Sequence, residues 1–240
     1  MVYSRVNFYF WVMINLGLVF VLVPLCSAGK WQDDFRDNNA KAWTPQKPPW
    51  VRSQSWTVKN GVYVAEVIGD DQSYSVTGEP TWDDYYIEAK VRYPKKGETP
   101  FHIGVGVRYQ GPDNGYDFGF ILFPIGGPTR ALAWGGGVGN FVGRFFEEPF
   151  PIKPDTWYLL KMEVKGNHFE CFVDGKQVGQ FDNKAVKSGK ATLWGGPGDF
   201  EFDDVTISGA KIPNRVLAVQ PHEKLATTWG GIKSDKRLVR

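Results

Sequence analysis

Two adjacent carboxylates, Asp203 and Asp204, stand in the middle of residues 199–208, a stretch whose other residues favour a strand. Neighbouring carboxylates repel each other and disfavour a strand, so water, a turn, a metal ion or a substrate is needed to compensate them. Alternation along the strand places Asp203 with Val205 on one side and Asp204 with Phe202 on the other, unless a bulge intervenes.

Histidine and cysteine give little support for metal binding or nucleophilic catalysis. The three histidines, His102, His168 and His222, do not cluster in the sequence, and neither HExxH nor CxxC occurs. A zinc site is therefore not expected. Cys171 falls on the apolar side of its predicted strand and is expected to be a buried small hydrophobic residue. The sequence also lacks a G-x-S-x-G motif and a phosphate-binding loop.

The elements that must position these side chains are predicted to be strands. Apolar and polar residues alternate in segments such as DYYIEAKVRY, FHIGVGVRY and HFECFVDGKQVGQF, and turn signals such as KNG, VKGN and VDGK separate them. We expect about a dozen short strands and no amphipathic helix. The sequence therefore predicts an all-β fold, a two-sheet antiparallel sandwich of the jelly-roll type, over residues 29–212.

The first 28 residues differ from this pattern. They combine one early positive charge, a long apolar run and small residues near Ala28, which predicts a secretory signal peptide and an extracellular or periplasmic protein. The length of the apolar run leaves an uncleaved membrane anchor as the alternative. Cleavage would remove Cys26 and leave Cys171 alone, so the mature chain could form no internal disulfide.

Residues 213–240 also lose the alternation and carry six Lys or Arg against two Asp or Glu. We expect a basic C-terminal tail that docks on the sandwich through Leu225 and Trp229 or contacts an acidic surface, the alternative being a loosely ordered tail. The whole chain has a formal charge of only +2, so nothing in it calls for a nucleic-acid partner.

Three spaced anchors resemble the concanavalin A-like lectin/glucanase superfamily. They are WQDDF at 31–35, WTVKNGVY at 56–63, and the pair WYLLKMEVKGNHFECFVDGKQV and FEFDDVTI near the end. The chain looks most similar to the secreted laminin G-like, 3-keto-disaccharide-hydrolase-like and family 16 glycosidase-like domains of bacteria. This resemblance implies a jelly roll whose curved sheet holds a glycan in its concave face, in a fold that hosts lectins, binding modules and hydrolases.

Glycoside hydrolysis usually requires two carboxyl groups that flank the scissile bond. Family 16 glycosidases place theirs on one strand as Glu-x-Asp-x-x-Glu, and this sequence lacks that spacing. Glu88 is followed on its face by Lys90 and Arg92, while Glu163 and Glu170 lie on two strands of a hairpin without a spaced partner. The retaining mechanism of that family is therefore not expected, and a different hydrolase or lyase chemistry stays open.

One polar sheet face is the candidate binding surface. In residues 101–109, alternation directs His102, Gly104, Gly106 and Arg108 outward, and the two glycines would leave a trough for a ligand. Arginine offers a planar fork of donors to vicinal hydroxyls.

Aromatic side chains near strand ends would complete such a groove. Tyr116, Trp134 and Trp82 could stack on a pyranose ring, and Glu88 faces outward on its own strand. The predicted ligand-binding residues are Glu88, Arg108, Tyr116 and Trp134. The alternative is a solvated face whose charges pair across strands.

The resemblance also implies a structural calcium ion on the convex side. The matching positions are Asp34 in the first strand, the carbonyl of Gly61 in the following turn, and Asp203 in the last strand. Calcium prefers six to eight oxygen ligands, and extracellular calcium fills even weak sites. The alternative is that the aspartates cap turns or pair with Lys and Arg.

Two functions follow from these observations. The first is a secreted carbohydrate-binding or adhesion module that recognises a polysaccharide or glycan, and the second is a secreted glycoside-active hydrolase with a non-standard site. The missing carboxylate spacing favours the first. A structural envelope protein that binds no sugar is a third alternative, which a smooth, charge-paired face would favour.

Overall fold

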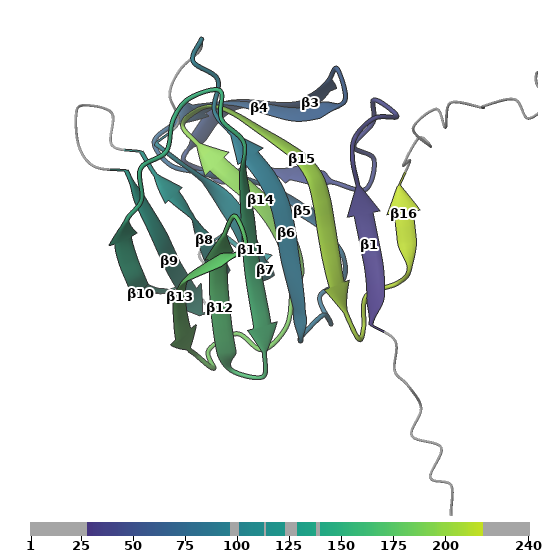
Figure 1. Cartoon of the computed structure of the whole chain (residues 1–240), viewed down its shortest axis with the longest axis vertical. Coiled ribbons are helices and arrows are strands. Elements are labelled where there is room, and N and C mark those ends of the chain that lie inside the picture. Colours follow the sequence, from purple (N-terminus) through teal and green to yellow (C-terminus); the bar gives the residue numbers. More distant parts are fainter. Residues whose placement is uncertain (1–27, 97–100, 113, 123–128, 138–139, 218–240) are drawn as a thin grey trace, which may run out of the picture.

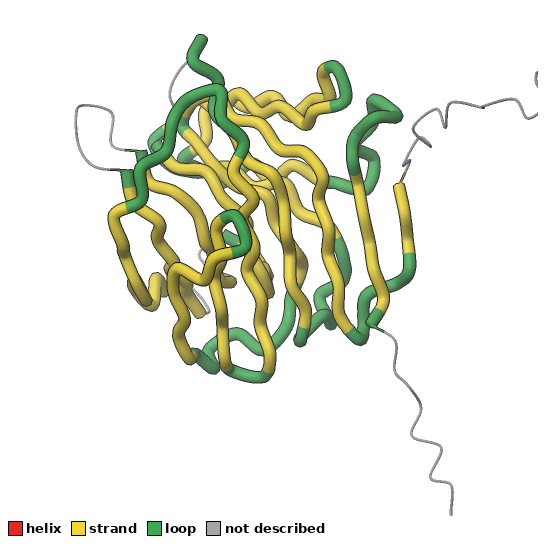
Figure 2. The backbone as a smooth tube through the Cα atoms, in the orientation of Figure 1, coloured by secondary structure: helices red, strands yellow, loops and turns green. Residues whose placement is uncertain are grey.

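The computed structural model describes residues 28–96, 101–112, 114–122, 129–137 and 140–217. These ranges form sixteen strands in two sheets that pack face to face (Figures 1 and 2). No helix lies in the described ranges, and so none there could cross a membrane. The prediction of an all-β sandwich is confirmed. The predicted signal peptide and most of the basic tail lie outside the described residues.

The larger sheet has nine strands. Seven follow the order β13-β12-β11-β6-β15-β1-β16, β4 pairs with the first half of β15, and β3 pairs with β4. Its strands are β1 (Gly29–Asp33), β3 (Val51–Lys59), β4 (Val62–Gly69), β6 (Tyr85–Arg92), β11 (Tyr158–Lys165), β12 (His168–Val173), β13 (Lys176–Asp182), β15 (Gly198–Gly209) and β16 (Arg215–Leu217).

The smaller sheet has seven strands in the order β10-β9-β8-β7-β14-β5-β2. They are β2 (Thr44–Gln46), β5 (Ser73–Thr77), β7 (His102–Gly111), β8 (Asn114–Ile121), β9 (Arg130–Gly137), β10 (Asn140–Pro149) and β14 (Lys190–Gly196).

Turn chemistry explains how the predicted hairpins close. The β3–β4 turn has Asn60 and Gly61 at φ 54° and 73°, and the β12–β13 turn has Asp174 and Gly175 at φ 50° and 77°. Two successive positive φ values define a type I′ turn, whose twist matches that of the flanking strands. Asn, Asp and Gly tolerate these φ values.

The core lies between the two sheets, where the predicted alternation holds. Along β6 the side chains of Tyr85, Ile87, Ala89 and Val91 are at most 3% exposed, and the residues between them are half-buried. Each large apolar side chain removed from water in this way contributes about 1.5–3 kcal/mol to folding. The free thiol of Cys171 is buried there, and burial raises its pKa well above the ordinary value.

A bulge resolves the position of the adjacent aspartates in β15. The pairing of β15 with β6 shifts between Asp203 and Thr206, and Asp204 has φ 48°. Simple alternation is therefore wrong beyond Asp203, because the extra residue turns Asp204 outward and returns Val205 to the core, where it is 1% exposed. Asp204 then binds the Lys90 ammonium at 2.6 Å.

The tail does not begin where the alternation ends. β16 pairs in parallel with β1, and its Val216 lies opposite Gln32. The backbone N–H of Lys30 also donates to Asn214 Oδ1 at 2.9 Å. Residues 213–217 therefore extend the nine-stranded sheet, whereas Leu225 and Trp229 lie outside the described residues.

Candidate functional site

The four predicted ligand-binding residues do not share one groove. Glu88 lies on the outer face of the nine-stranded sheet, Trp134 on the outer face of the seven-stranded sheet, and Arg108 and Tyr116 point into the interior. Trp82, another expected platform, is 3% exposed and packs in the core against Tyr85. The expected single groove is therefore corrected to three separate locations.

Arg108 turns inward because β7 carries a bulge. The register of β7 with β8 shifts between Val107 and Gly111, and Arg108 has φ 56°. Its guanidinium donates to the carbonyls of Asp83, Val186 and Gly166 at 2.7–3.0 Å and to the Asp84 carboxylate at 3.3 Å. At 2% exposure, this side chain joins loops inside the fold and is not available to a ligand.

Tyr116 forms hydrogen bonds at the same end of the sandwich as Arg108. Its hydroxyl donates to Asn183 Oδ1 at 2.7 Å and accepts from the backbone N–H of Val186 at 3.0 Å. Burial raises the pKa of this phenol above its ordinary value. Arg108 and Tyr116 thus meet at the loop after β13, as buried supports.

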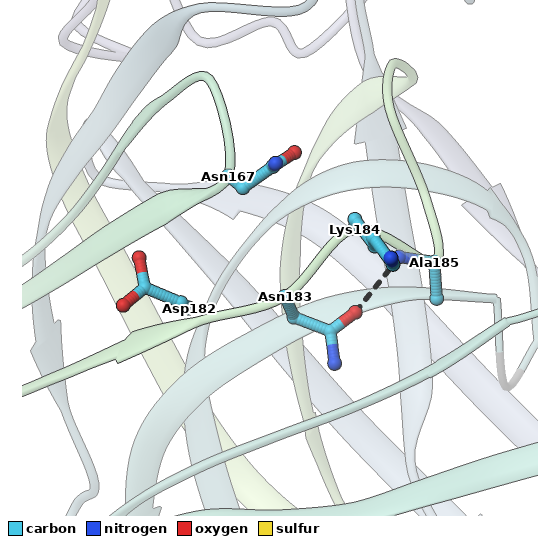
Figure 3. Close-up of a pocket in the computed structure, with 5 residues that line it drawn as sticks. All are labelled: Asn167, Asp182, Asn183, Lys184 and Ala185. Carbon is cyan, nitrogen blue, oxygen red and sulfur yellow. Dashed lines mark hydrogen bonds between the residues drawn. The ribbon is translucent and has the colours of Figure 1, made fainter.

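That loop forms one wall of an open hollow of about 520 Å³. The hollow is lined by Asn167, Asp182, Asn183, Lys184 and Ala185 (Figure 3). The Asn183 side chain is held by the backbone N–H of Ala185 at 2.8 Å, so it is turned toward its own loop. The hollow has no aromatic side chain among its described lining residues, and it offers a sugar no stacking surface.

The outer face of the seven-stranded sheet is very different. Its buried and half-buried side chains form a second apolar cluster, separate from the core, which we call the aromatic face. Its members are Tyr74, Val76, Phe101, Tyr109, Ile121, Leu132, Trp134 and Trp194, and His102 packs among them.

Two tryptophans form the centre of the aromatic face. The ring centres of Trp134 and Trp194 are 4.6 Å apart in an edge-to-face arrangement, and the centre of the His102 ring lies 5.6 Å from that of the Trp194 ring. Trp194 is fully buried, Trp134 is 8% exposed and His102 6%. The centre of the aromatic face is therefore closely packed, and little of its surface is accessible to solvent.

The predicted glycine trough lies on this face and is filled by side chains. A Cβ at Gly104 would lie 2.3 Å from the Trp194 ring. A Cβ at Gly106 would lie 2.4 Å from both Asp117 Oδ1 and Thr192 Oγ1. The glycines thus admit an indole and two oxygen-bearing side chains instead of leaving open space.

Several polar atoms on this side of the sheet have no hydrogen-bond partner within the described structure. They include the indole Nε1 of Trp194 and the hydroxyl Oγ1 of Thr192, which lies on the same strand, and both side chains are fully buried. A buried polar group without a partner costs about 1–3 kcal/mol.

An acid–base pair lies at the edge of the aromatic face. His102 Nε2 is 3.3 Å from Asp71 Oδ1, and the Asp71 side chain is 52% exposed. Burial opposes the charged carboxylate, but the nearby His102 ring and the hydrogen bond from the backbone N–H of Gln72 outweigh it and keep the pKa of Asp71 below its ordinary value. Arg130 and Glu147, which form an ion pair, stand on the opposite side of the face.

The three predicted calcium positions do converge, around Arg36. A Cβ at Gly61 would lie 3.6 Å from the Arg36 Cα, and the Arg36 guanidinium is 3.7 Å from Asp34. Burial raises the pKa of Asp203, and the charge of nearby Arg36 acts in the opposite direction.

The charge around these positions is already balanced. Arg36 neutralises Asp34, and Lys90 neutralises Asp204. In the described ranges, no three His, Cys, Asp or Glu side chains gather closely enough to hold a metal ion. A calcium ion would have to displace Arg36, whose side chain is 41% exposed, and rely on backbone oxygens. The calcium site stays a prediction.

Sequence reasoning missed most of the aromatic face. Tyr74 lies in a short strand whose every residue is buried, and Trp194 in one where every residue except Lys190 is buried, so no alternation marks the two sides. Asp71 and His102 are 31 positions apart and meet only through strand pairing. The available signals were the outward assignment of His102, Gly104 and Gly106 and the prediction of Trp134 as a stacking ring.

Comparisons with known proteins identify the fold. The endo-β-1,3-glucanase of Pyrococcus furiosus superposes with a TM-score of 0.51 at 11% identity, over 75% of this chain and 93% of that one. The carbohydrate recognition domain of Emp47p superposes with a TM-score of 0.52 at 12% identity, over 77% and 96%. The chain therefore has the concanavalin A-like sandwich fold.

A sequence relative is an extracellular exo-α-L-arabinofuranosidase of Streptomyces chartreusis, 25% identical over 157 residues. The match covers 65% of this chain and only 17% of that enzyme. The family model of the 3-keto-α-glucoside-1,2-lyase-like domain matches residues 30–224. The protein is thus a carbohydrate-active domain, and it belongs to the 3-keto-α-glucoside-1,2-lyase-like family.

Proposed function

We propose that the protein is a secreted carbohydrate-binding or adhesion module that holds a polysaccharide or glycan against the aromatic face. The observation that carries this proposal is the aromatic face itself, a cluster of aromatic rings on the outer side of the seven-stranded sheet with the exposed carboxylate of Asp71 at its edge. Secretion is supported by the predicted signal peptide and by the extracellular relative.

The chemistry of the aromatic face suits a sugar. Aromatic rings pack against the C–H faces of pyranose and furanose rings, while hydroxyl groups need donors and acceptors at fixed positions. The rim supplies the polar groups, because Asp71 is exposed and Arg130 and Glu147 are half-exposed. The centre of the aromatic face supplies the small accessible parts of the Trp134, Tyr109 and His102 rings.

Binding to a polysaccharide panel tests the proposal. Arabinan, a soluble β-1,3-glucan and a soluble α-glucan are measured by affinity electrophoresis and calorimetry with the wild type and with Trp134→Ala. We expect binding to at least one polysaccharide and a loss of at least tenfold in the variant. The matched control is Trp157→Ala, whose half-buried ring stacks on Arg92 near the other sheet and should bind as the wild type does. Absence of binding by the folded wild type would refute the module.

The Asp71–His102 pair favours a second candidate, a glycoside-active enzyme. An imidazole oriented by a carboxylate can take up a proton, and elimination next to a carbonyl needs a base of that kind. The family description names such a substrate class, the 3-keto-α-glucosides. Release of the aglycone from a 3-keto-α-glucoside by the wild type, and its loss in His102→Ala, would establish the enzyme. No turnover by a wild type that binds the panel would leave the binding module.

A further inference from the structure

The outer face of the nine-stranded sheet carries a groove that the proposed function does not use. We call it the sheet groove, and its volume is about 450 Å³, within the range of ligand pockets. The lining side chains used below are Lys30, Gln32, Glu88, Lys90, Leu159 and Thr206. They come from β1, β6, β11 and β15, which lie side by side in Figure 1.

The fold builds the walls of the sheet groove. The bulge in β15 turns Asp204 outward, where it holds the Lys90 ammonium at 2.6 Å. The segment after β1 supplies Asp34 and Arg36 at one end. Leu159 lies opposite Lys90 in the β11–β6 register and gives the groove an apolar floor. The walls of the groove therefore come from four neighbouring strands and from the segment after β1.

The sheet groove presents both donors and acceptors. Gln32 Nε2 donates to Thr206 Oγ1 at 3.2 Å. Within the described structure, the Glu88 carboxylate and the Lys30 ammonium have no hydrogen-bond or ion-pair partner among protein side chains. Three cations, Lys30, Arg36 and Lys90, line the groove. They stand against four carboxyl groups, those of Asp33, Asp34, Glu88 and Asp204, so the groove does not favour a polyanion.

An aromatic platform adjoins the sheet groove. Lys161 lies directly opposite Glu88 in the β11–β6 register. The Lys161 ammonium is 4.5 Å from the centre of the Tyr86 ring and 5.1 Å from that of Phe172. Both rings are half-buried on the outer face, so part of each contacts water. A chain of sugar rings that left the groove past Glu88 would meet these rings.

We propose that the sheet groove is a second glycan-binding site for a neutral, hydroxyl-rich oligosaccharide. Mixed donors and acceptors with an adjoining ring surface are what such a ligand needs, and the balanced charge suits a neutral chain. The inference rests on the proposed function, since the ligand is again a carbohydrate. The two sites lie on opposite outer faces of the sandwich, so one domain would bridge two polysaccharide chains and gain avidity on a surface.

Stoichiometry separates the two sites. The titrant is the six-residue oligosaccharide of arabinan, β-1,3-glucan or α-glucan that the wild type binds, and calorimetry is run on four folded proteins. We expect two sites per chain in the wild type and one in Gln32→Ala/Glu88→Ala. Trp134→Ala should also keep one site. The matched control, Glu170→Ala/Gln180→Ala, removes a facing Glu–Gln pair elsewhere on the same sheet and should keep two.

Each outcome is decisive. One site per chain in the wild type, lost in Trp134→Ala, would overturn the second site and leave the proposed function intact. No binding to any oligosaccharide or polysaccharide of the panel would overturn both. Polysaccharide cross-linking, measured as turbidity, should disappear in the Gln32→Ala/Glu88→Ala variant, and unchanged turbidity would also refute the inference.

Discussion

Asp33 makes the stability of this protein depend on pH in an unusual direction. The carboxylate is 3% exposed at the end of β1, where it accepts from the backbone N–H of Phe35 at 3.0 Å and from the indole N–H of Trp43 at 3.1 Å. Burial outweighs these two bonds and raises the pKa of Asp33 from 3.8 to about 6. The folded protein therefore holds this proton more tightly than the unfolded chain does.

The raised pKa fixes the sign and size of the effect. Below the unfolded pKa both states are protonated, and the contribution of Asp33 to folding is fully present. As pH rises through the folded pKa, a buried charge must form and stability is lost. A shift of about two units corresponds to about 3 kcal/mol, at 1.36 kcal/mol per unit. The loss should extend from about pH 4 to about pH 7.

Asp33→Asn tests this reasoning, because the amide resembles the protonated carboxyl and cannot ionise. The free energy of unfolding is measured by urea titration from pH 4 to pH 8, with Trp fluorescence as the probe. At pH 4 the variant should be close to the wild type, and by pH 7.5 it should gain about 3 kcal/mol relative to it. Asp34→Asn is the control: its carboxylate faces Arg36, so its removal should give no such gain. Parallel wild-type and Asp33→Asn curves would refute the assignment.

Other predictions concern the interior and the calcium site. Arg108→Met should lower the free energy of unfolding by about 3–5 kcal/mol, because it leaves buried carbonyls unpaired. The control Arg52→Met, at an exposed position, should lower it by less than about 0.5 kcal/mol. Equal losses of stability in urea titrations would contradict the role of Arg108. Cys171 should not react with a thiol reagent in the native protein and should react fully in denaturant; native reactivity would contradict its burial. Calcium at millimolar concentration should raise the melting temperature of the wild type, and Asp203→Asn should reduce this increase. If EDTA leaves the melting temperature unchanged and elemental analysis finds no metal, the predicted calcium site is refuted.

Local pattern determined much of the secondary structure. Alternation in residues 85–92 specified which side chains are buried, and Asn60–Gly61 specified a tight hairpin turn. Both signals act between residues close in the chain, because side-chain direction in a strand has a period of two and a positive φ is a property of the residue itself. The two-sheet class followed from the number of such strands.

Bulges limited the same reasoning. An inserted residue inverts every side chain beyond it, as it did at Arg108 in β7 and at Asp204 in β15. Neither residue type demands a positive φ, and the strain is compensated by distant contacts, the buried bonds of Arg108 to other loops and the ion pair of Asp204 with Lys90. The local sequence does not contain these partners.

The assignment of strands to sheets was decided only by the tertiary structure. Glu88 and His102 lie on strands that follow one another in sequence, yet β6 pairs in the nine-stranded sheet and β7 in the seven-stranded one, so their outward faces lie on opposite sides of the molecule. Sequence could determine that each residue faces away from the core. Which residues share a surface depends on long-range pairing, because a strand exposes similar polar positions in whichever sheet it joins.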